Sequence, residues 1–346
     1  MKKSLIARCV TLAGVALISG NLFAGDPAAE MAEAANKFLA SLKADQKAKA
    51  SYPLKGEDRY RWHFIPTEMV KGGRTGLSMI DMDAKQRDLA KALLKSATSG
   101  TGYKKATQIM MLEGILRASE KNGKLDRNPI LYFVSIFGEP SATGTWAWRY
   151  EGHHLSMAFT VIDGKTVVST PSFMGSNPAE VTSGKSKGLR VLAKEEDLAR
   201  ELVKSLDASQ RELAVFDKKA PRDILSGANR KAEELAPKGL GFGKLNAQQK
   251  KALQALVREY VFRSRTEVAK ADLANIAKEG WDKVHFAWAG GFEKGEGHYY
   301  RIQGPSFMLE YANTQNDAHH VHAAWREFHG DYGDDLLAKH FANDHK

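Results

Sequence analysis

One helix-capping pattern occurs four times in this chain, and the first two copies recur after almost the same number of residues. This repetition constrains the fold more than any other feature of the sequence. In three copies an Asp or Asn is followed three residues later by Gln, which is the capping box that opens a helix. The fourth copy, at 42–47, has Lys at the capping position. The copy at 42 precedes the one at 206 by 164 residues, and the copy at 82 precedes the one at 245 by 163. Equal steps favour a duplicated chain over unrelated helices that reuse a good cap.

Two aromatic segments, 132–159 and 285–311, repeat a second pattern. Each reads as strand, glycine turn, strand, glycine turn, strand, and alignment by eye pairs Trp146 with Tyr299. Runs of strands that follow runs of helices indicate an α+β fold rather than a parallel α/β sheet. The sequence therefore predicts an α+β protein of two pseudo-repeated halves, each with helices followed by an antiparallel β-meander.

Hydrophobic periodicity and turn residues predict the individual elements. A segment rich in Gly, Ser and Pro, 172–187, is the expected boundary, which gives a first half at 25–187 and a second half at 188–346. Helices are expected near 28–50, 83–97, 103–121, 195–216, 222–236, 246–279 and 334–341. Strands are expected near 130–137, 145–151, 154–162, 166–173, 283–290, 297–303, 306–312 and 318–326.

Residues 1–24 have the features of a secretory signal peptide. Lys2, Lys3 and Arg8 flank the start of a short apolar stretch, and small residues lead to Ala24, after which cleavage is expected. The stretch is too short to cross a bilayer core of roughly 30 Å. We therefore expect export to the periplasm or the extracellular space, without stable membrane insertion.

The composition of the remaining chain excludes several classes of protein. The only cysteine of the full sequence, Cys9, lies in the predicted signal, so the rest of the chain has no cysteine nucleophile and no metal–thiolate site. A metal ion would therefore need imidazole, carboxylate or carbonyl ligands. The formal net charge of +10 is spread along the chain, which does not favour a nucleic-acid partner. The chain also lacks a Gly-x-Ser-x-Gly elbow and the glycine motifs of nucleotide-binding proteins.

Histidines concentrate near the C-terminus. Eight of the eleven lie after residue 284, and His320 and His322 share one face if 318–326 is a strand. Two rings on one face can bind one metal ion, and His298 or Glu310 on a neighbouring strand is the expected third ligand. The alternatives are hydrogen-bonded core histidines, or a helical segment in which His319 pairs with His322 instead.

A second histidine pair, His153 and His154, lies in the first half. It follows Trp146 and Trp148, whose side chains share one face of a strand. The two indoles are either a core pair or a stacking floor for a sugar or other flat ligand. If the two halves meet face to face, His153 or His154 would approach His320 and His322.

Three further residues are candidates for catalysis. Glu310 lies in an apolar segment, where a carboxylate either pairs with a cation or has a raised pKa suited to proton transfer. Arg301 is expected one strand away, and Tyr299 lies beside it in sequence. We expect Tyr299 and Arg301 to position an anionic or carbonyl-bearing substrate.

Several of these segments resemble the exported bacterial proteins grouped as domain of unknown function 3500. The resemblance covers nearly the whole chain after the predicted signal, and His320-Val321-His322 matches its closing motif. Ala312 and His319 depart from the pattern, which has Asp and Asn there, so neither position is expected to be essential. The family brings no assigned activity. The other matching segments are RWHFIP at 61–66, GHHLS at 152–156, HYYRIQGP at 298–305 and EYANTQN at 310–316.

Two functional hypotheses follow. The first is an exported metalloprotein that binds zinc or copper, with zinc for hydrolysis or copper for oxidation or metal handling. Its expected metal ligands are His320, His322, His298, His153 and His154, and its expected catalytic residues are Glu310, Tyr299 and Arg301. The second is a non-catalytic binding protein whose aromatic faces hold a small molecule, glycan or peptide.

Overall fold

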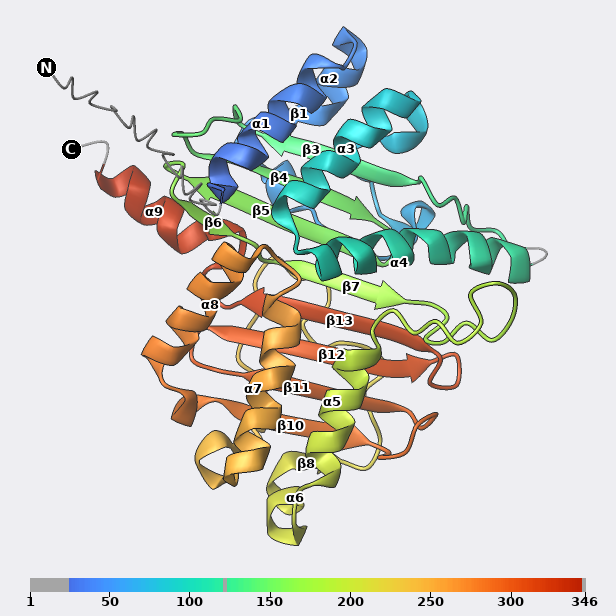
Figure 1. Ribbon diagram of the computed structural model, residues 1–346, viewed down its shortest axis with the longest axis vertical. Helices are drawn as coiled ribbons and strands as arrows, with labels where there is room; N and C mark the ends of the chain where they lie inside the picture. Colours follow the sequence, from blue (N-terminus) through green and yellow to red (C-terminus); the bar gives the residue numbers. More distant parts are fainter. Residues whose placement is uncertain (1–24, 121–122, 344–346) are drawn as a thin grey trace, which may run out of the picture.

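The structure, a computed structural model, describes residues 25–120 and 123–343, and the predicted signal peptide lies outside them. Across these residues, nine α-helices pack against one mixed sheet of thirteen strands (Figure 1). The first eight helices lie on one face of the sheet (Figure 1), whereas long segments without regular structure cover the other, where Leu337 of the last helix also packs against Ile162 and Val168. This segregation of helices from a largely antiparallel sheet confirms the α+β class.

The order of the sheet reads alike from both edges. Its path is β1-β3-β4-β5-β7-β13-β12-β11-β10-β8, in which every pair is antiparallel except the parallel outer pairs β1–β3 and β10–β8. The short strands β2 and β9 add antiparallel partners to β3 and β10, and β6 pairs with β5. The strands are β1 Ser51–Tyr52, β2 Leu77–Ser78, β3 Tyr132–Phe137, β4 Trp146–Gly152, β5 Leu155–Ile162, β6 Thr166–Val168, β7 Ser172–Ser176, β8 Val215–Asp217, β9 Leu240–Gly241, β10 His285–Gly290, β11 His298–Gln303, β12 Phe307–Gln315 and β13 His320–Glu327.

The middle of the sheet is the pair β7–β13, which joins strands from the two ends of the chain. Its register places Phe173 opposite Ala324 and Gly175 opposite His322. The segment 172–187, predicted as the boundary, therefore begins with a strand, because Ser172–Ser176 pairs with β5 on one edge and with β13 on the other. The Ser and Gly residues of this segment are typical of a loop. Ladder pairing on both edges makes it a strand.

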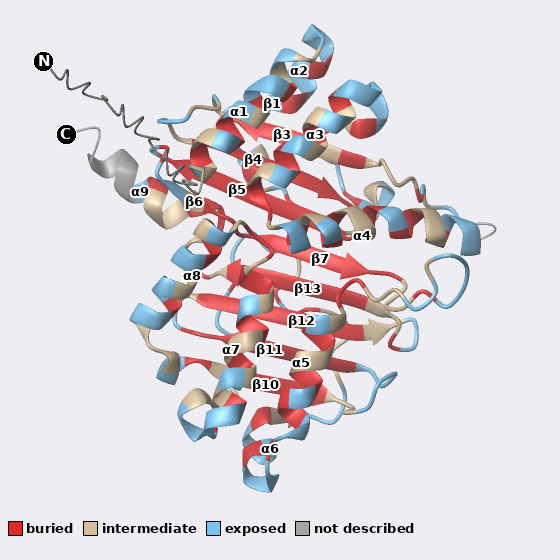
Figure 2. Cartoon of the chain, viewed as in Figure 1, coloured by how far each residue is buried: buried red, intermediate tan, exposed pale blue. Residues whose placement is uncertain are grey.

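Helices cover one face of the sheet in two similar layers. α1 packs on α3 over the first strands, and α5 packs on α7 over the last ones (Figure 1). Buried residues face the sheet and exposed residues face outward (Figure 2). The helices are α1 Pro27–Ala40, α2 Ala44–Ala50, α3 Ala84–Ala97, α4 Gly100–Ser119, α5 Ala193–Lys204, α6 Ala208–Ala214, α7 Ala247–Val261, α8 Thr266–Glu279 and α9 Asp334–Asn343.

The helix predicted at 222–236 is absent. The segment instead crosses the face of the sheet away from the helices as bends and turns. The amides of Leu225 and Ser226 donate to the carboxylate of Glu310 rather than to helical carbonyls, and Gly227 has a positive φ of 52°. Tertiary hydrogen bonds thus override a helical pattern of moderate strength.

The four capping patterns form two matched pairs of buried glutamines. In the first half, the amide of Gln46 donates to Gln86 Oε1 at 3.1 Å, and the amide of Gln86 donates back at 2.8 Å. In the second half, Gln210 and Gln249 exchange the same two bonds at 3.0 and 2.9 Å.

Each glutamine oxygen also accepts the N–H of its own capping residue, at 2.9 to 3.1 Å. Each glutamine amide also donates to a backbone carbonyl of the partner segment. The recurring pattern therefore joins a short helix to a long one twice, through fully hydrogen-bonded amides.

We predict that Gln249→Ala lowers the free energy of unfolding by about 2 kcal/mol, because it leaves the buried amide of Gln210 without its partner. The measurement is urea denaturation followed by circular dichroism. Gln248→Ala is the matched control, since Gln248 is exposed on the same helix turn. Equal midpoints for the two variants would contradict the role of the pair.

Candidate metal centre

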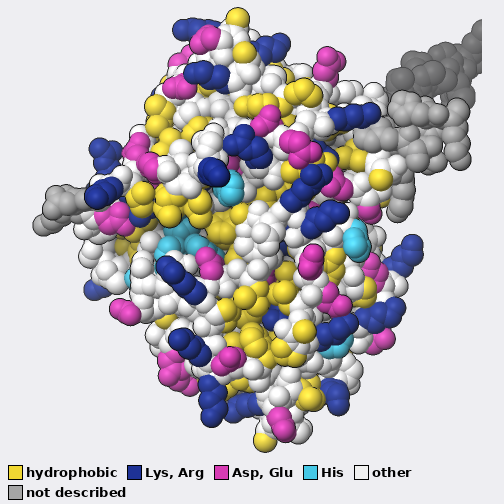
Figure 3. Space-filling model, turned by 180° about the vertical axis from the view of Figure 1, so that it is seen from behind, with side chains coloured by type: hydrophobic (Ala, Val, Ile, Leu, Met, Phe, Trp, Pro, Cys, Tyr) yellow, Lys and Arg dark blue, Asp and Glu magenta, His cyan; other side chains and the backbone are white. Residues whose placement is uncertain are grey.

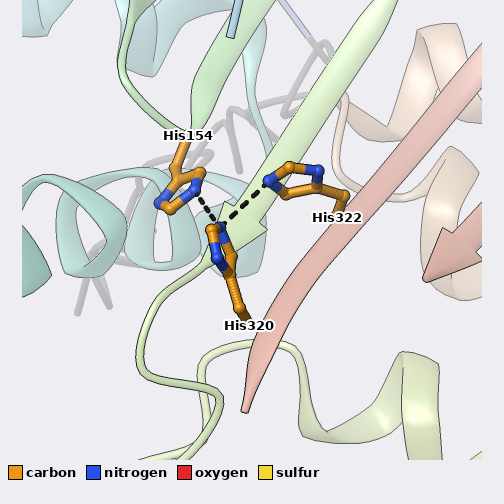
Figure 4. A group of neighbouring side chains, drawn as sticks. All are labelled: His154, His320 and His322. Atoms are coloured by element: carbon orange, nitrogen blue, oxygen red, sulfur yellow. Dashed lines mark hydrogen bonds between the residues drawn. The ribbon is translucent and has the colours of Figure 1, made fainter. Parts of the chain in front are cut away.

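Three imidazole rings from two separate segments meet on the face of the sheet away from the helices. His320 and His322 lie two positions apart on β13 and share one face of the strand, as the sequence predicts. His154 comes from the turn between β4 and β5 (Figure 4). The Nε2 atom of His320 lies 2.7 Å from Nε2 of His154 and 3.1 Å from Nε2 of His322. We call these residues the three-histidine centre.

The backbone around His154 holds its ring over β7. His154 has a φ of 61°, in the left-handed region that non-glycine residues rarely adopt. Its N–H donates to the carbonyl of Phe64 at 2.9 Å, and its carbonyl accepts from Gly175 at 2.7 Å. A Cβ at position 175 would lie 2.8 Å from Cδ2 of His154, so only glycine leaves room for the ring.

Asp223 fixes the ring of His322 from behind. Its Oδ1 lies 2.6 Å from Nδ1 of His322, so the proton belongs on Nδ1 and the lone pair of Nε2 points toward the centre. Burial raises the pKa of Asp223, but the hydrogen bond from His322 and the electrostatic interaction with that ring outweigh burial, so the net pKa is lowered. The stacked rings of Phe64 and Phe173 flank His322 edge-on and exclude water from that side.

Two rings of the centre, His154 and His320, favour the neutral form. Burial, followed by the neighbouring imidazoles, lowers the pKa of His154 well below its ordinary value and the pKa of His320 to about 3. Neutral imidazole is the form that binds a metal ion. His320 is half-buried, and seen from behind, histidine side chains reach the surface between hydrophobic ones (Figure 3).

His153, predicted as a metal ligand, belongs to a neighbouring group. Its Nδ1 lies 2.6 Å from Oε1 of Glu113 and 3.0 Å from Nη1 of Arg127, while its ring stacks on His154 with centroids 3.7 Å apart. Glu113, His153 and His154 also lie close enough together to hold an ion. The Nδ1 atom of His153 already contacts Glu113 and Arg127, so the contacts in this group are those of a hydrogen-bonded cluster rather than of an open metal site.

The structure does not bring His298 to the three-histidine centre. Its side chain lies on the helix-facing side of β11, stacked between Trp288 and Tyr311. Its Nδ1 contacts the carbonyl of Glu296 at 2.9 Å, and burial is the main reason that its pKa is lowered to about 4. Side chains alternate along a strand, so His298 points away from the face used by Tyr299.

Glu310 and Tyr299 share the face of the three-histidine centre but contact a different set of atoms. Glu310 is fully buried and accepts from Leu225 N–H at 2.6 Å, Ser226 N–H at 3.0 Å and the Tyr299 hydroxyl at 2.7 Å. The segment that Glu310 holds begins with Asp223. Glu310 therefore supports the partner of His322 rather than touching the histidines.

Arg301, the third predicted catalytic residue, is also a supporting residue. Its guanidinium donates to the carbonyl of Pro237 and lies over the ring of Phe216. It is fully buried and lies in the ladder opposite Glu310. A fully buried guanidinium that binds a backbone carbonyl does not present itself to a substrate.

Three contributors to the centre escape prediction from the sequence. Asp223 has no recognisable motif around it, and Gly175 matters only because of the ring that passes over it. Phe64 lies in the segment 61–66, which is one of those that resemble the family, but the resemblance does not indicate what Phe64 does.

The fold and the site together define an α+β protein with an imidazole cluster at the centre of one sheet. The chain belongs to the family described as protein of unknown function DUF3500, whose model matches residues 24–334. No curated protein and no solved structure matches the chain. Among the described residues, no helix is long and apolar enough to cross a bilayer.

We predict that Glu310→Gln loosens the segment that begins with Asp223, because a neutral amide accepts the two N–H groups of Leu225 and Ser226 more weakly than a carboxylate. Hydrogen–deuterium exchange at these amides should accelerate by about tenfold, which corresponds to about 1.4 kcal/mol. Glu212→Gln, at an exposed position of α6, is the control and should leave the exchange unchanged. Unchanged exchange in Glu310→Gln would contradict the supporting role.

Proposed function

We propose that this chain is a metalloprotein that binds one zinc or copper ion at the three-histidine centre. The observation that carries the proposal is the convergence of three Nε2 atoms, with neighbouring separations of 2.7 and 3.1 Å. The Nε2 atom of His320 cannot form full hydrogen bonds to both neighbouring rings, because a neutral ring nitrogen carries either one proton or one lone pair. All three residues are also close enough to ligate one ion.

The residues present fit a zinc or copper ion. Three imidazoles leave a coordination position for water or substrate, which is the arrangement of catalytic zinc sites, and imidazole also suits copper. Bound zinc would supply a Lewis acid for hydrolysis, whereas copper would supply redox chemistry or be carried as cargo. Asp223 would fix the tautomer of His322, and Phe64 and Phe173 would keep bulk water away from that ring.

A binding protein with an indole floor, the alternative from the sequence, loses its main support. Trp146 is fully buried, and Trp148 is 1% exposed and stacked on Phe159 beneath the helices. Neither indole can reach a glycan or peptide. The metal-centre proposal uses side chains that are clustered and partly open to solvent.

The duplication is part of the same proposal. It is supported by the order of the sheet, which reads alike from both edges, and by the two pairs of glutamines. On this view the halves 25–187 and 188–346 join at β7–β13, and the centre takes His154 from one half and His320 and His322 from the other. Export, proposed from residues 1–24, would place the centre outside the cytoplasm.

Metal analysis tests the proposal directly. We expect the chain without residues 1–24, purified without a histidine tag or chelator, to contain about one equivalent of zinc or copper, as for a single three-ligand site. The double variant His320→Ala/His322→Ala should lose it while keeping its circular dichroism spectrum. His319→Ala is the control, because His319 adjoins the centre in sequence but lies outside the cluster. Metal-free protein after incubation with both ions would overturn the proposal.

A second prediction concerns Gly175. The added methyl group of Gly175→Ala would lie 2.8 Å from the ring of His154 and displace it, so we expect metal affinity to fall by about tenfold or more. Competition with a chromophoric chelator measures the affinity. Gly243→Ala serves as the control, because a Cβ there has no neighbour within 4 Å. Equal affinities in the two variants would rule out His154 as a ligand.

A further inference from the structure

A large cleft adjoins the turn that precedes the three-histidine centre. Its volume is about 1180 Å³, and it lies between α4 and the segment 177–186. Asn316 and His319, in the turn between β12 and β13, also line it. Pockets for drug-sized ligands usually have volumes of about 300 to 1,000 Å³, so this cleft has room for an elongated molecule.

The walls of the cleft are mainly apolar. α4 contributes Met110, Met111 and Ile115, and the facing segment contributes Pro178 and Val181. Met111 is 38% exposed although α4 buries its opposite side on the sheet, so this helix has an apolar surface without a protein partner among the described residues. Flexible methionine side chains adapt to ligands of irregular shape.

The free charges of the cleft are positive. Lys185 has no carboxylate partner among the described residues, and Lys91 has only a loose contact of 3.7 Å with Asp88. The one acidic side chain in the lining, Glu120, is neutralised by two bonds of 2.9 Å from Arg127. An apolar cavity with two available ammonium groups is complementary to a long apolar molecule with an anionic end.

We propose that the cleft binds the anion of a fatty acid, with the alkyl chain against α4 and the carboxylate drawn by the positive charge of Lys91 or Lys185. The proposal goes beyond the proposed function, because His154, His320 and His322 do not line the cleft. His319 lines the cleft and is followed directly by His320, so a bound ligand would contact the turn that carries a metal ligand. Binding itself uses none of the three histidines.

Isothermal titration of the metal-free chain tests this with two probes of equal chain length, both below their critical micelle concentrations. We expect dodecanoate to bind with one-to-one stoichiometry and dodecyltrimethylammonium to bind at least about tenfold more weakly, a difference of about 1.4 kcal/mol. Met111→Asp should weaken dodecanoate binding by a similar factor, because it places a carboxylate beside the alkyl chain. Lys91→Glu/Lys185→Glu should reverse the preference between the two probes.

Matched controls separate these effects from general changes. Leu213→Asp introduces the same charge at an exposed apolar position of α6, far from the cleft (Figure 1), and Lys218→Glu/Lys219→Glu changes the net charge by the same amount at exposed positions. Both should bind dodecanoate as the unaltered chain does. The proposal is overturned if dodecanoate does not bind, or if Met111→Asp and Leu213→Asp bind it equally.

The two proposals fail independently. The variant His320→Ala/His322→Ala should keep dodecanoate binding while it loses metal, since neither residue lines the cleft. Metal binding without dodecanoate binding would leave the centre in place and remove the fatty-acid assignment. Dodecanoate binding by a chain that binds no metal would support the fatty-acid assignment and remove the metal centre.

Discussion

The antiparallel pair β7–β13 is the interaction on which the rest of the structure depends. It converts two sets of strands, far apart in the chain, into one continuous sheet. The same ladder sets His322 opposite Gly175, and the missing side chain of that glycine leaves space for His154. Since side-chain direction alternates with every residue, a shift of one position in this register would turn both histidines of β13 toward the helices.

The two faces of the sheet differ in what covers them and in the kind of contact that holds the cover in place. Helices bury an apolar layer on one face, whereas the other is covered by irregular segments whose backbone groups need partners. Buried side chains supply those partners, as Glu310 does for Leu225 and Ser226. The centre is thus assembled from loops and turns that a rigid sheet positions, which is the usual division between scaffold and site.

Much of the scaffold follows from local sequence. The capping boxes at Asp83, Asp207 and Asn246 open helices as predicted, and alternation places His320 and His322 on one face of β13. The α+β class and the shared face of His320 and His322 could therefore be predicted from the sequence. These features depend on residues within a few positions of one another.

The errors arise where distant contacts or single-residue register decide the outcome. His298 differs from Tyr299 by one position, and that position sends it to the opposite face of the sheet. The alignment by eye that pairs Trp146 with Tyr299 has the same fault, since Trp146 faces the helices and Tyr299 does not. Asp223 reaches His322 across 99 positions of the chain, and no local pattern encodes that contact.

The paired glutamines have a consequence for how the molecule responds to its surroundings. Side-chain amides neither gain nor lose a proton in the physiological range, and their mutual bonds carry no net charge for dissolved ions to screen. The joints between short and long helices are therefore indifferent to acidity and ionic strength.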